Sequence, residues 1–332
     1  MKNILVTGGG GFIGQAIVRK LISKGLQVNV VGRNTYPQLA ALGVRCHRGD
    51  IRDLDFLKSI FEGIDTVFHV AAKAGIWGTK EEYFSINTQG THNVIAACQY
   101  ASVPALIYTS TPSVVFARAP LTGADERLPY ATNPLCHYAA SKIEAEKQVL
   151  AASGNGLRTT AIRPHLVWGP GDQHLIPRLL ERGRQGKLKI VGKGDNMVDI
   201  SYIDNVVHAH ILAAENLHAS GSAGGNAFFI GQEQPVALWE WINSLFTRVG
   251  ITQVSTKVPF SLAYLAGGVL EGVYGLAGCK TEPKMTRFLA HQLAHSHWFS
   301  HNNAKNILGY REQVSTAEGM VQLVSWVRRE AV

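Results

Sequence analysis

The sequence predicts an α/β fold, built as a doubly wound parallel sheet followed by a smaller C-terminal region. Three observations support this. Short apolar runs alternate with helical patterns through the first half, a glycine-rich turn follows the first run, and the alternation ends after Gly169-Pro170-Gly171. The chain has 332 residues, of which 46% are hydrophobic and 17% charged, so a large folded core is expected.

The elements follow one another in a regular order. Short β-branched or apolar runs predict strands at ILVTG (4–8), VNVVG (28–32), DTVFHVAA (65–72), ALIYTST (105–111) and RTTAIRPHLVWG (158–169). Helical spacing predicts helices at 12–25, 53–63, 91–101 and 137–152. Strands and helices that alternate at this pitch favour a parallel sheet covered on both faces.

The predicted domain boundary lies near residue 170. Residues 1–170 are expected to form the nucleotide-binding domain with the catalytic residues, and 171–332 mainly a substrate-binding region. Part of the second region, about 197–232, is expected to return to the large sheet through NAFFIG (226–231).

A glycine-rich turn stands directly between the first strand and the first helix. Gly8, Gly11 and Gly14 have the spacing of a dinucleotide-binding Rossmann turn, with Phe12 and Ile13 opening the helix. Glycine permits the tight turn, the approach of the pyrophosphate and close packing of helix on strand, and the helix N-terminus offers N–H donors.

The end of the second strand indicates which dinucleotide is bound. NAD-binding proteins usually place an acidic residue there, but this strand ends in Gly32-Arg33-Asn34. The Arg33 guanidinium can pair with a 2′-phosphate, so NADP(H) is the predicted cofactor, and a solvated loop arginine is the alternative.

A phenol and an ammonium lie four residues apart on the helix predicted at 137–152. Tyr138 and Lys142 share one helix face, and a nearby cation is expected to lower the pKa of the phenol from about 10. A strand rich in hydroxyl groups, including Thr111 and Ser113, precedes this helix. This combination predicts acid–base chemistry.

Several motifs in order resemble the extended short-chain dehydrogenase/reductase family. They are TGGGGFIG (7–14), GDI (49–51), HVAA (69–72), NTQGT (87–91), YAASK (138–142) and RP…WGPGD (163–172), the last with Trp168 in place of the usual tyrosine. The resemblance covers nearly the whole chain and implies an NADP-dependent oxidoreductase acting on CH–OH groups.

The resemblance also implies roles for individual residues. Tyr138 is expected to give the proton to the substrate oxygen, Lys142 to bind the nicotinamide ribose, and Thr111 to bind the substrate oxygen. The cofactor-binding residues are expected to include Asp50, Ile51, Ala71, Ala72 and Pro164, and substrate-pocket candidates are Ser113, Lys73, Trp77, His165 and Trp168. Asn87 is expected to hold backbone or water near the site.

Within the family, AAKAGIWG (71–78), YTSTPSVVF (108–116) and NILGY (306–310) are similar to the 3β-hydroxysteroid dehydrogenase branch. AAKAGIWG and GRN (32–34) further resemble its bacterial reductases of 2-alkyl-3-oxoalkanoates from long-chain olefin biosynthesis. This implies NADPH-dependent ketone reduction on a large apolar keto acid, with a sterol ketone as the alternative. The resemblance also implies a homodimer and assembly with other olefin-pathway enzymes.

An apolar stretch at 258–278 carries one charged residue, Glu271. Its length alone permits a bilayer span, but Pro259 and five glycines in the stretch argue against one. We expect a helical pair that covers the active site and lines an alkyl tunnel, with membrane contact or plain core as alternatives.

Charge, cysteine and histidine patterns narrow the remaining functions. The formal charge of +8 comes from scattered residues, which does not favour nucleic acid. Four cysteines without paired spacing and an N-terminus without a signal-peptide pattern predict a cytoplasmic protein, with peripheral membrane contact as the alternative. The spacing of His291, His295 and His297 predicts no metal site.

Two other functions remain open on the sequence. A nucleotide-sugar epimerase or dehydratase shares the glycine, YxxxK and RP motifs, although Arg33 and the apolar 258–278 stretch argue against it. A non-catalytic NADP sensor is the other, although the chain keeps both Tyr138 and Lys142.

Overall fold

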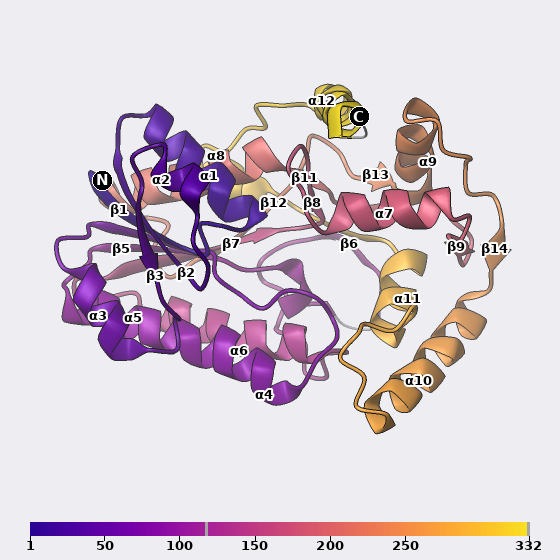
Figure 1. Cartoon of the computed structure of the whole chain (residues 1–332), viewed down its shortest axis with the longest axis horizontal. Helices are drawn as coiled ribbons and strands as arrows, with labels where there is room; N and C mark the ends of the chain where they lie inside the picture. Colours follow the sequence, from indigo (N-terminus) through magenta and orange to yellow (C-terminus); the bar gives the residue numbers. More distant parts are fainter. Residues whose placement is uncertain (117–118, 331–332) are drawn as a thin grey trace.

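The computed structural model describes residues 1–116 and 119–330. Its centre is a seven-stranded parallel sheet in the order β12-β7-β5-β4-β1-β2-β3 (Figure 1). The strands are β1 (Asn3–Thr7), β2 (Gln27–Gly32), β3 (Arg45–Arg48), β4 (Thr66–His69), β5 (Ala105–Thr109), β7 (Arg158–Pro164) and β12 (Ala227–Ile230). This confirms the predicted doubly wound α/β fold.

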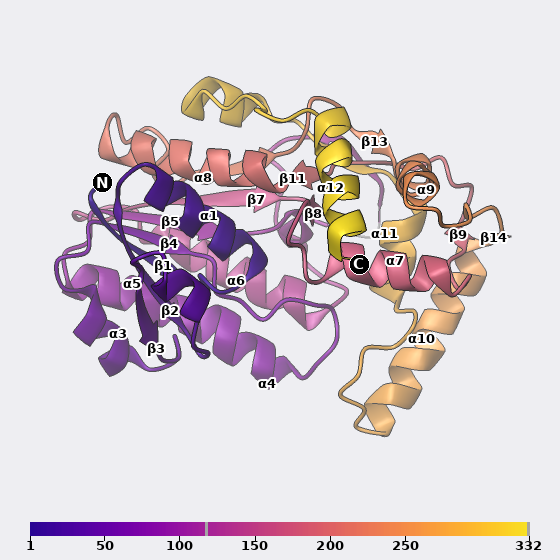
Figure 2. The ribbon, with the colours of Figure 1, turned by 45° about the horizontal axis from the view of Figure 1, so that its top comes forward.

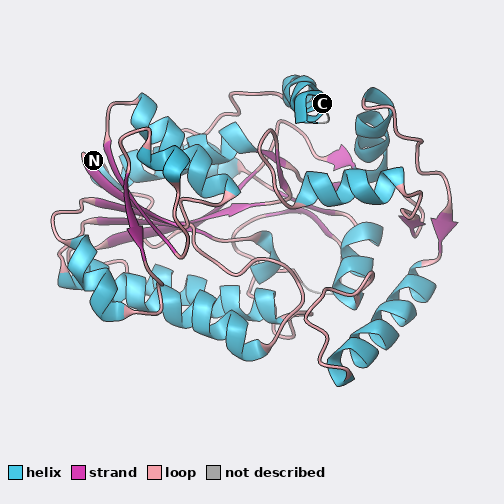
Figure 3. Ribbon diagram, viewed as in Figure 1, coloured by secondary structure: helices cyan, strands magenta, loops and turns pink. Residues whose placement is uncertain are grey.

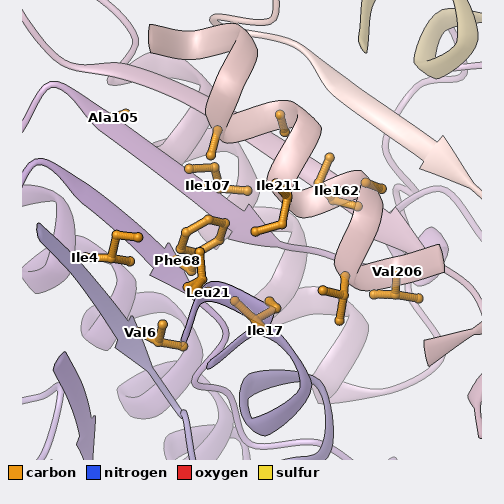
Figure 4. Packing of buried hydrophobic residues seen from close by; sticks show 14 of the residues in the cluster. Ile4, Val6, Ile17, Leu21, Phe68, Ala105, Ile107, Ile162, Val206 and Ile211 are labelled. Carbon is orange, nitrogen blue, oxygen red and sulfur yellow. The ribbon is translucent and has the colours of Figure 1, made fainter. Parts of the chain in front are cut away.

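Helices cover both faces of this sheet, as Figure 3 shows. α1 (Phe12–Ser23) and α8 (Ile203–His218) pack on one face, and α3 (Leu54–Phe61), α5 (Gly90–Tyr100) and α6 (His137–Ala151) on the other. Alternate residues of each strand point to opposite faces. Ile4 and Val6 therefore join the core beneath α1 and α8 (Figure 4), and Leu5 joins the core beneath α3, α5 and α6.

The strand order reverses at β1, which has β2 on one side and β4 on the other. Connections leave the carboxyl ends of β1 and β4 toward opposite faces of the sheet, and ligands bind in the crevice that this reversal opens. The glycine turn after β1 and the loop after β4 therefore lie at the expected place for a bound dinucleotide.

A second region lies beyond the carboxyl ends of the strands (Figure 2). Its sheet has the order β13-β10-β15-β6. The strands outside the large sheet are β6 (Leu121–Ala124), β8 (Val167–Trp168), β9 (Ile190–Val191), β10 (Met197–Val198), β11 (Ser201–Tyr202), β13 (Val236–Ala237), β14 (Lys257–Val258) and β15 (His297–Phe299). The remaining helices are α2 (Pro37–Ala40), α4 (Lys80–Tyr83), η1 (Phe84–Gln89), η2 (Pro112–Val114), α7 (Leu175–Arg184), α9 (Leu238–Arg248), α10 (Phe260–Leu276), α11 (Arg287–Ala294), η3 (Ala304–Leu308) and α12 (Thr316–Glu330).

The chain passes between the two regions in both directions. β6 comes from the first 170 residues and joins the small sheet, whereas α8 and β12 come from the second part and pack in the large one. NAFFIG thus pairs with β7, as expected for the returning strand. The division at residue 170 stays a prediction.

One strand was missed, and two local expectations were wrong. β3 was not predicted, because its sequence RCHR lacks the apolar pattern of a strand. The strand expected over 158–169 is divided into β7 and β8, since Leu166 has a left-handed φ of 41° that no β-ladder accommodates. The apolar stretch forms the single helix α10, which pairs with α11 rather than with a second helix of its own.

Candidate active site

The glycine turn has the geometry that a dinucleotide requires. Gly8 has a φ of +69°, and a Cβ placed on it would lie 2.7 Å from the backbone nitrogen of Ala71 after β4. A Cβ on Gly14 would collide with the backbone of Gly8, so this glycine lets α1 approach the turn. The predicted needs for glycine, in the tight turn at Gly8 and in the close packing of helix on strand at Gly14, are therefore met.

The N-terminus of α1 is open toward this crevice. Gly11 is the N-cap residue and has no side chain to accept from the first N–H groups of α1. A Cβ on Gly11 would meet Gly8 O at 3.4 Å and no other described atom within 4 Å. Exposed backbone donors and the positive end of the helix dipole fit a diphosphate.

Positive charge gathers where the adenosine half of a dinucleotide would lie. Arg33 is exposed after β2, and Arg48 Nε donates to its carbonyl oxygen at 3.3 Å. Asp50 pairs with Arg52 at 2.7 Å, and the hydrogen bond from Arg52, aided by the charge of Arg33, lowers the pKa of the Asp50 carboxyl. The guanidinium groups of Arg52 and Arg33 thus both act on this one carboxylate.

Tyr36 is a residue of this crevice that the sequence analysis missed. Added Cβ atoms on Gly10 and Gly32 would both overlap its ring, so the ring lies against the two glycine-containing turns. No local spacing marks this contact, because it depends on the path of the loop between β2 and α2.

The three predicted catalytic side chains come together at the ends of β5 and α6. Lys142 is buried, with its Nζ donating to Thr109 O at 2.7 Å and lying 4.0 Å from the ring centroid of Tyr108. The Thr111 hydroxyl hydrogen-bonds to the half-buried phenol of Tyr138. Ser113 lies beside them, with its hydroxyl 3.2 Å from that of Thr111.

Burial sets the acidities of these groups. Desolvation raises the pKa of Tyr138 to about 12, and the hydrogen bond from Thr111 opposes this rise. Desolvation lowers the pKa of Lys142 to about 7, against an opposing effect of the Glu146 carboxylate. The lowered Tyr138 pKa expected from its spacing to Lys142 is therefore not found, because desolvation dominates the shift.

Asn87 joins the loop after β4 to the catalytic helix. Its Oδ1 accepts from Lys73 N at 2.7 Å, and its Nδ2 donates to Lys73 O at 3.1 Å and to Ser141 Oγ at 3.0 Å. The expected backbone-holding role of Asn87 is thus confirmed. The position of Lys73 is fixed relative to α6.

A cavity of about 650 Å³ opens between α4, α6 and α10. Lys73 and Trp77 line it from the loop after β4, and the Trp77 indole donates to Cys279 O at 2.9 Å. His137 and Ala140, on either side of Tyr138, line it from α6, and Tyr274 lines it from α10. The cavity therefore lies next to the catalytic helix.

Two other substrate-pocket candidates lie elsewhere. Trp168 is fully buried between Tyr202 and Trp241, with ring centroids 5.1 Å from each, so it is a core residue and not a pocket wall. His165, which follows Pro164 of β7, is buried and hydrogen-bonded to His297 through ring nitrogens 2.7 Å apart.

The histidines near α11 have structural contacts. The rings of His291 and His295 stack at 5.0 Å and pack against Phe260. Across residues 1–116 and 119–330, no group of three or more potential metal ligands was found. Within the same residues, none of the helices is both long and apolar enough to cross a bilayer.

The chain belongs to the 3-beta hydroxysteroid dehydrogenase/isomerase family, whose sequence model matches residues 5–260. It is 46% identical over 331 residues to the 2-alkyl-3-oxoalkanoate reductase of Shewanella oneidensis, covering 97% of this chain and 86% of that protein. It is 35% identical over 335 residues to the human sterol-4-alpha-carboxylate 3-dehydrogenase, decarboxylating, covering 98% and 88%. The protein is therefore an extended short-chain dehydrogenase/reductase and an oxidoreductase.

Solved structures share the fold and a nicotinamide dinucleotide. MoeE5 in complex with UDP-glucose and NAD superimposes with a TM-score of 0.77 at 26% identity, covering 99% of this chain and 100% of that one. The dTDP-glucose 4,6-dehydratase DesIV of Streptomyces venezuelae, with NAD bound, also has a TM-score of 0.77 at 26% identity, covering 98% and 97%. The family thus depends on a nicotinamide dinucleotide, and the turn at Gly8 has a geometry that fits one.

Proposed function

We propose that this protein uses NADPH to reduce the ketone of a 2-alkyl-3-oxoalkanoate to the 3-hydroxy acid. The observation that carries the proposal is a catalytic helix that brings Tyr138 and Lys142 to Thr111 and borders a 650 Å³ cavity through His137 and Ala140, in a chain 46% identical to reductases of this name. A sterol ketone is the second candidate, supported by the 35% identity to a sterol dehydrogenase.

The names of the relatives share a chemical pattern. In a 2-alkyl-3-oxoalkanoate the carbonyl carbon is next to the carbon that bears the carboxylate. A sterol-4-alpha-carboxylate has its position 3 next to the carboxylate-bearing position 4. This common relation favours a β-oxo acid as the substrate class of the present chain.

The side chains divide the chemistry between them. A bound reduced nicotinamide supplies the hydride to the carbonyl carbon. Tyr138 gives its proton to the carbonyl oxygen, and Thr111 donates a hydrogen bond to the charge that develops there. A pKa of about 12 keeps Tyr138 protonated at neutral pH, which suits an acid in the direction of reduction.

Lys73 is positioned to receive the substrate carboxylate. It lines the cavity, and its Nζ lies 3.3 Å from Glu82, a carboxylate that is 55% exposed. The other basic residues on the cavity wall are Lys280 and Arg287, and Arg287 is held by Glu271 at 2.7 Å. Because Asn87 ties the backbone of Lys73 to α6, the Lys73 side chain starts from a fixed point relative to Tyr138.

The preference for NADPH is supported by the surplus of positive charge around Arg33. In Arg33→Ala, the KM for NADPH should rise about tenfold or more, since a charge-assisted hydrogen bond is worth roughly 1.5–3 kcal/mol. The KM for NADH, which has no 2′-phosphate, should change little. Equal changes for both cofactors would remove the assignment of Arg33.

The activity can be tested with purified protein, NADPH and a racemic 2-alkyl-3-oxo acid, following the absorbance of the reduced nicotinamide. We expect NADPH oxidation coupled to formation of the 3-hydroxy acid, and slower turnover of the methyl ester, which has no charge for Lys73. Turnover of a nucleotide sugar alone would instead indicate an epimerase or dehydratase. Cofactor binding without any turnover would indicate a sensor.

A further inference from the structure

One face of α10 is apolar and exposed along its whole length. The described residues expose eight large hydrophobic side chains, and five of them belong to this helix: Leu262, Leu265, Val269, Val273 and Leu276, which are 55–94% exposed. Their spacing of three and four residues places them in one stripe. The opposite side of the helix buries Ala263 and Gly267 against α11.

We propose that this stripe docks on the surface of an anionic phospholipid bilayer. Exposed apolar patches of this kind mark interaction sites, and a helix with one apolar face can lie within the headgroup layer of a membrane. The inference deepens the proposed function, because it names the surface from which an apolar substrate would arrive.

The charges around α10 complement anionic headgroups. Four exposed lysines, Lys187, Lys189, Lys193 and Lys257, cluster around the β9–β14 ladder that leads into the helix. Lys280 and Lys284 are exposed just beyond its other end. Figures 1 and 2 both show α10, β9 and β14 along the same margin of the molecule.

The charge within the helix is neutralised. Glu271 is the one charged residue between Phe260 and Leu276. It accepts from Arg287 Nε and Arg287 N, each at 2.7 Å, and these bonds turn it toward α11 and away from the stripe. The stripe can therefore enter an apolar layer without carrying an unpaired carboxylate.

The dimensions fit a helix that lies on a bilayer instead of crossing one. Its 17 residues span about 25 Å at 1.5 Å per residue, which is shorter than the hydrocarbon core of about 30 Å. Four glycines, at 267, 268, 272 and 275, further weaken it as an independent span.

The same helix also lines the catalytic cavity. Glu271, Tyr274 and Gly275 face the cavity opposite His137 and Ala140 of α6, while Val269, Val273 and Leu276 are exposed outside. α10 thus separates the proposed lipid surface from the catalytic helix by the thickness of a single helix. An alkyl chain that leaves the bilayer would have a short path to Tyr138.

The test is co-sedimentation of the full chain with vesicles of phosphatidylglycerol and phosphatidylcholine, compared with phosphatidylcholine alone. We expect binding to the anionic vesicles that weakens in 0.5 M salt. The double variant Leu265→Glu/Val269→Glu should lose at least tenfold in binding. Val321→Glu is the matched control, since Val321 is 58% exposed on α12, and it should bind like the wild type.

Two further readouts keep the outcomes distinct. Turnover of a short, freely soluble 2-alkyl-3-oxo acid should be unchanged in the double variant, because neither side chain lines the cavity. Equal vesicle binding by wild type and double variant, or a wild type that does not bind, would overturn the proposal. The proposal would also be overturned if the wild type were a dimer that does not bind vesicles and the double variant were a monomer. Vesicle binding without ketone reduction would instead contradict the proposed function alone.

Discussion

α6 and α10, two of the helices that line the cavity, both depart from the usual distribution of side chains, in opposite ways. α6 buries Ser141, Lys142 and Glu146, whereas α10 exposes a stripe of leucine and valine. Buried polar groups and exposed apolar patches are the informative exceptions in a protein, because both are costly without a partner. The polar groups of α6 have partners within the chain, whereas the apolar face of α10 is exposed and would find its partner in the proposed bilayer surface.

Hydrogen-bond and ion-pair partners explain why α6 can bury polar side chains stably. Glu146 pairs with the Arg163 guanidinium of β7 and accepts from the Tyr130 hydroxyl at 2.9 Å. Lys142 donates to the carbonyl at the end of β5. These contacts hold α6 rigidly on the sheet, so the phenol of Tyr138 has a fixed position.

Among the tests of this contrast between α6 and α10, the largest expected effect is the loss of turnover when the phenol hydroxyl is removed. In Tyr138→Phe, kcat should fall by about 10²- to 10⁴-fold, the usual contribution of a general acid. NADPH affinity, measured by fluorescence titration, should stay within about threefold of the wild type. A variant that keeps its turnover would show that the chemistry does not depend on α6.

Thr111→Val should have the next largest effect. Valine keeps the shape of threonine but removes the hydroxyl that bonds Tyr138, so kcat should fall on the order of 10²-fold. Ser113→Ala is the matched control and should cost less than about tenfold, since the Ser113 hydroxyl bonds to that of Thr111, 3.2 Å away. The reverse ranking would transfer the substrate-binding role to Ser113.

Lys142 should leave a signature in the pH dependence of stability. Burial lowers the pKa of its ammonium to about 7, against about 10.4 in an unfolded chain. Between these values the unfolded state binds more protons, so this group makes the folded state more stable as pH rises. From pH 7 to pH 10, the unfolding free energy of the wild type should rise relative to Lys142→Met, on the order of 3 kcal/mol.

Chemical denaturation of both proteins at several pH values measures this difference. Other titrating groups are common to the two proteins and cancel in the comparison. A difference that stays constant over this range would mean that Lys142 keeps an ordinary pKa in the fold.

The smallest expected effect tests how α10 is held. A Cβ on Gly267 would lie 2.6 Å from the backbone carbon of Thr286, whereas one on Gly272 would meet nothing described within 4 Å. Gly267→Ala should therefore separate α10 from α11 and cost about 1–2 kcal/mol, and Gly272→Ala should stabilise the helix by about 0.5–1 kcal/mol. Limited proteolysis should cut Gly267→Ala faster and Gly272→Ala no faster than the wild type.

The sequence predicted what depends on local spacing. Gly8 and Gly14 are fixed by the turn between β1 and α1, and Tyr138 and Lys142 by one turn of α6, so their roles follow from residues near them in the chain. The large sheet followed from alternating apolar runs for the same reason.

The features that were missed depend on contacts between distant segments. Trp168 is in the core because Tyr202 and Trp241 enclose it, and Tyr36 contacts the glycine turn because its loop folds back over β2. The pKa of Tyr138 depends on how fully the surrounding elements desolvate it. The sequence left open whether the 258–278 stretch covers the site, contacts a membrane or lies in the core, because an apolar segment with a single charged residue is compatible with all three.

Isotope transfer tests most directly whether α6 carries out ketone reduction in this cavity. The protein would be incubated with NADPH deuterated at both C4 positions of the nicotinamide and a 2-alkyl-3-oxo acid, and the product analysed by mass spectrometry. We predict one deuterium at carbon 3 of the hydroxy acid, with at least about 100-fold less labelled product from Tyr138→Phe. Hydroxy acid without deuterium, or equal labelling by the variant, would contradict the assignment.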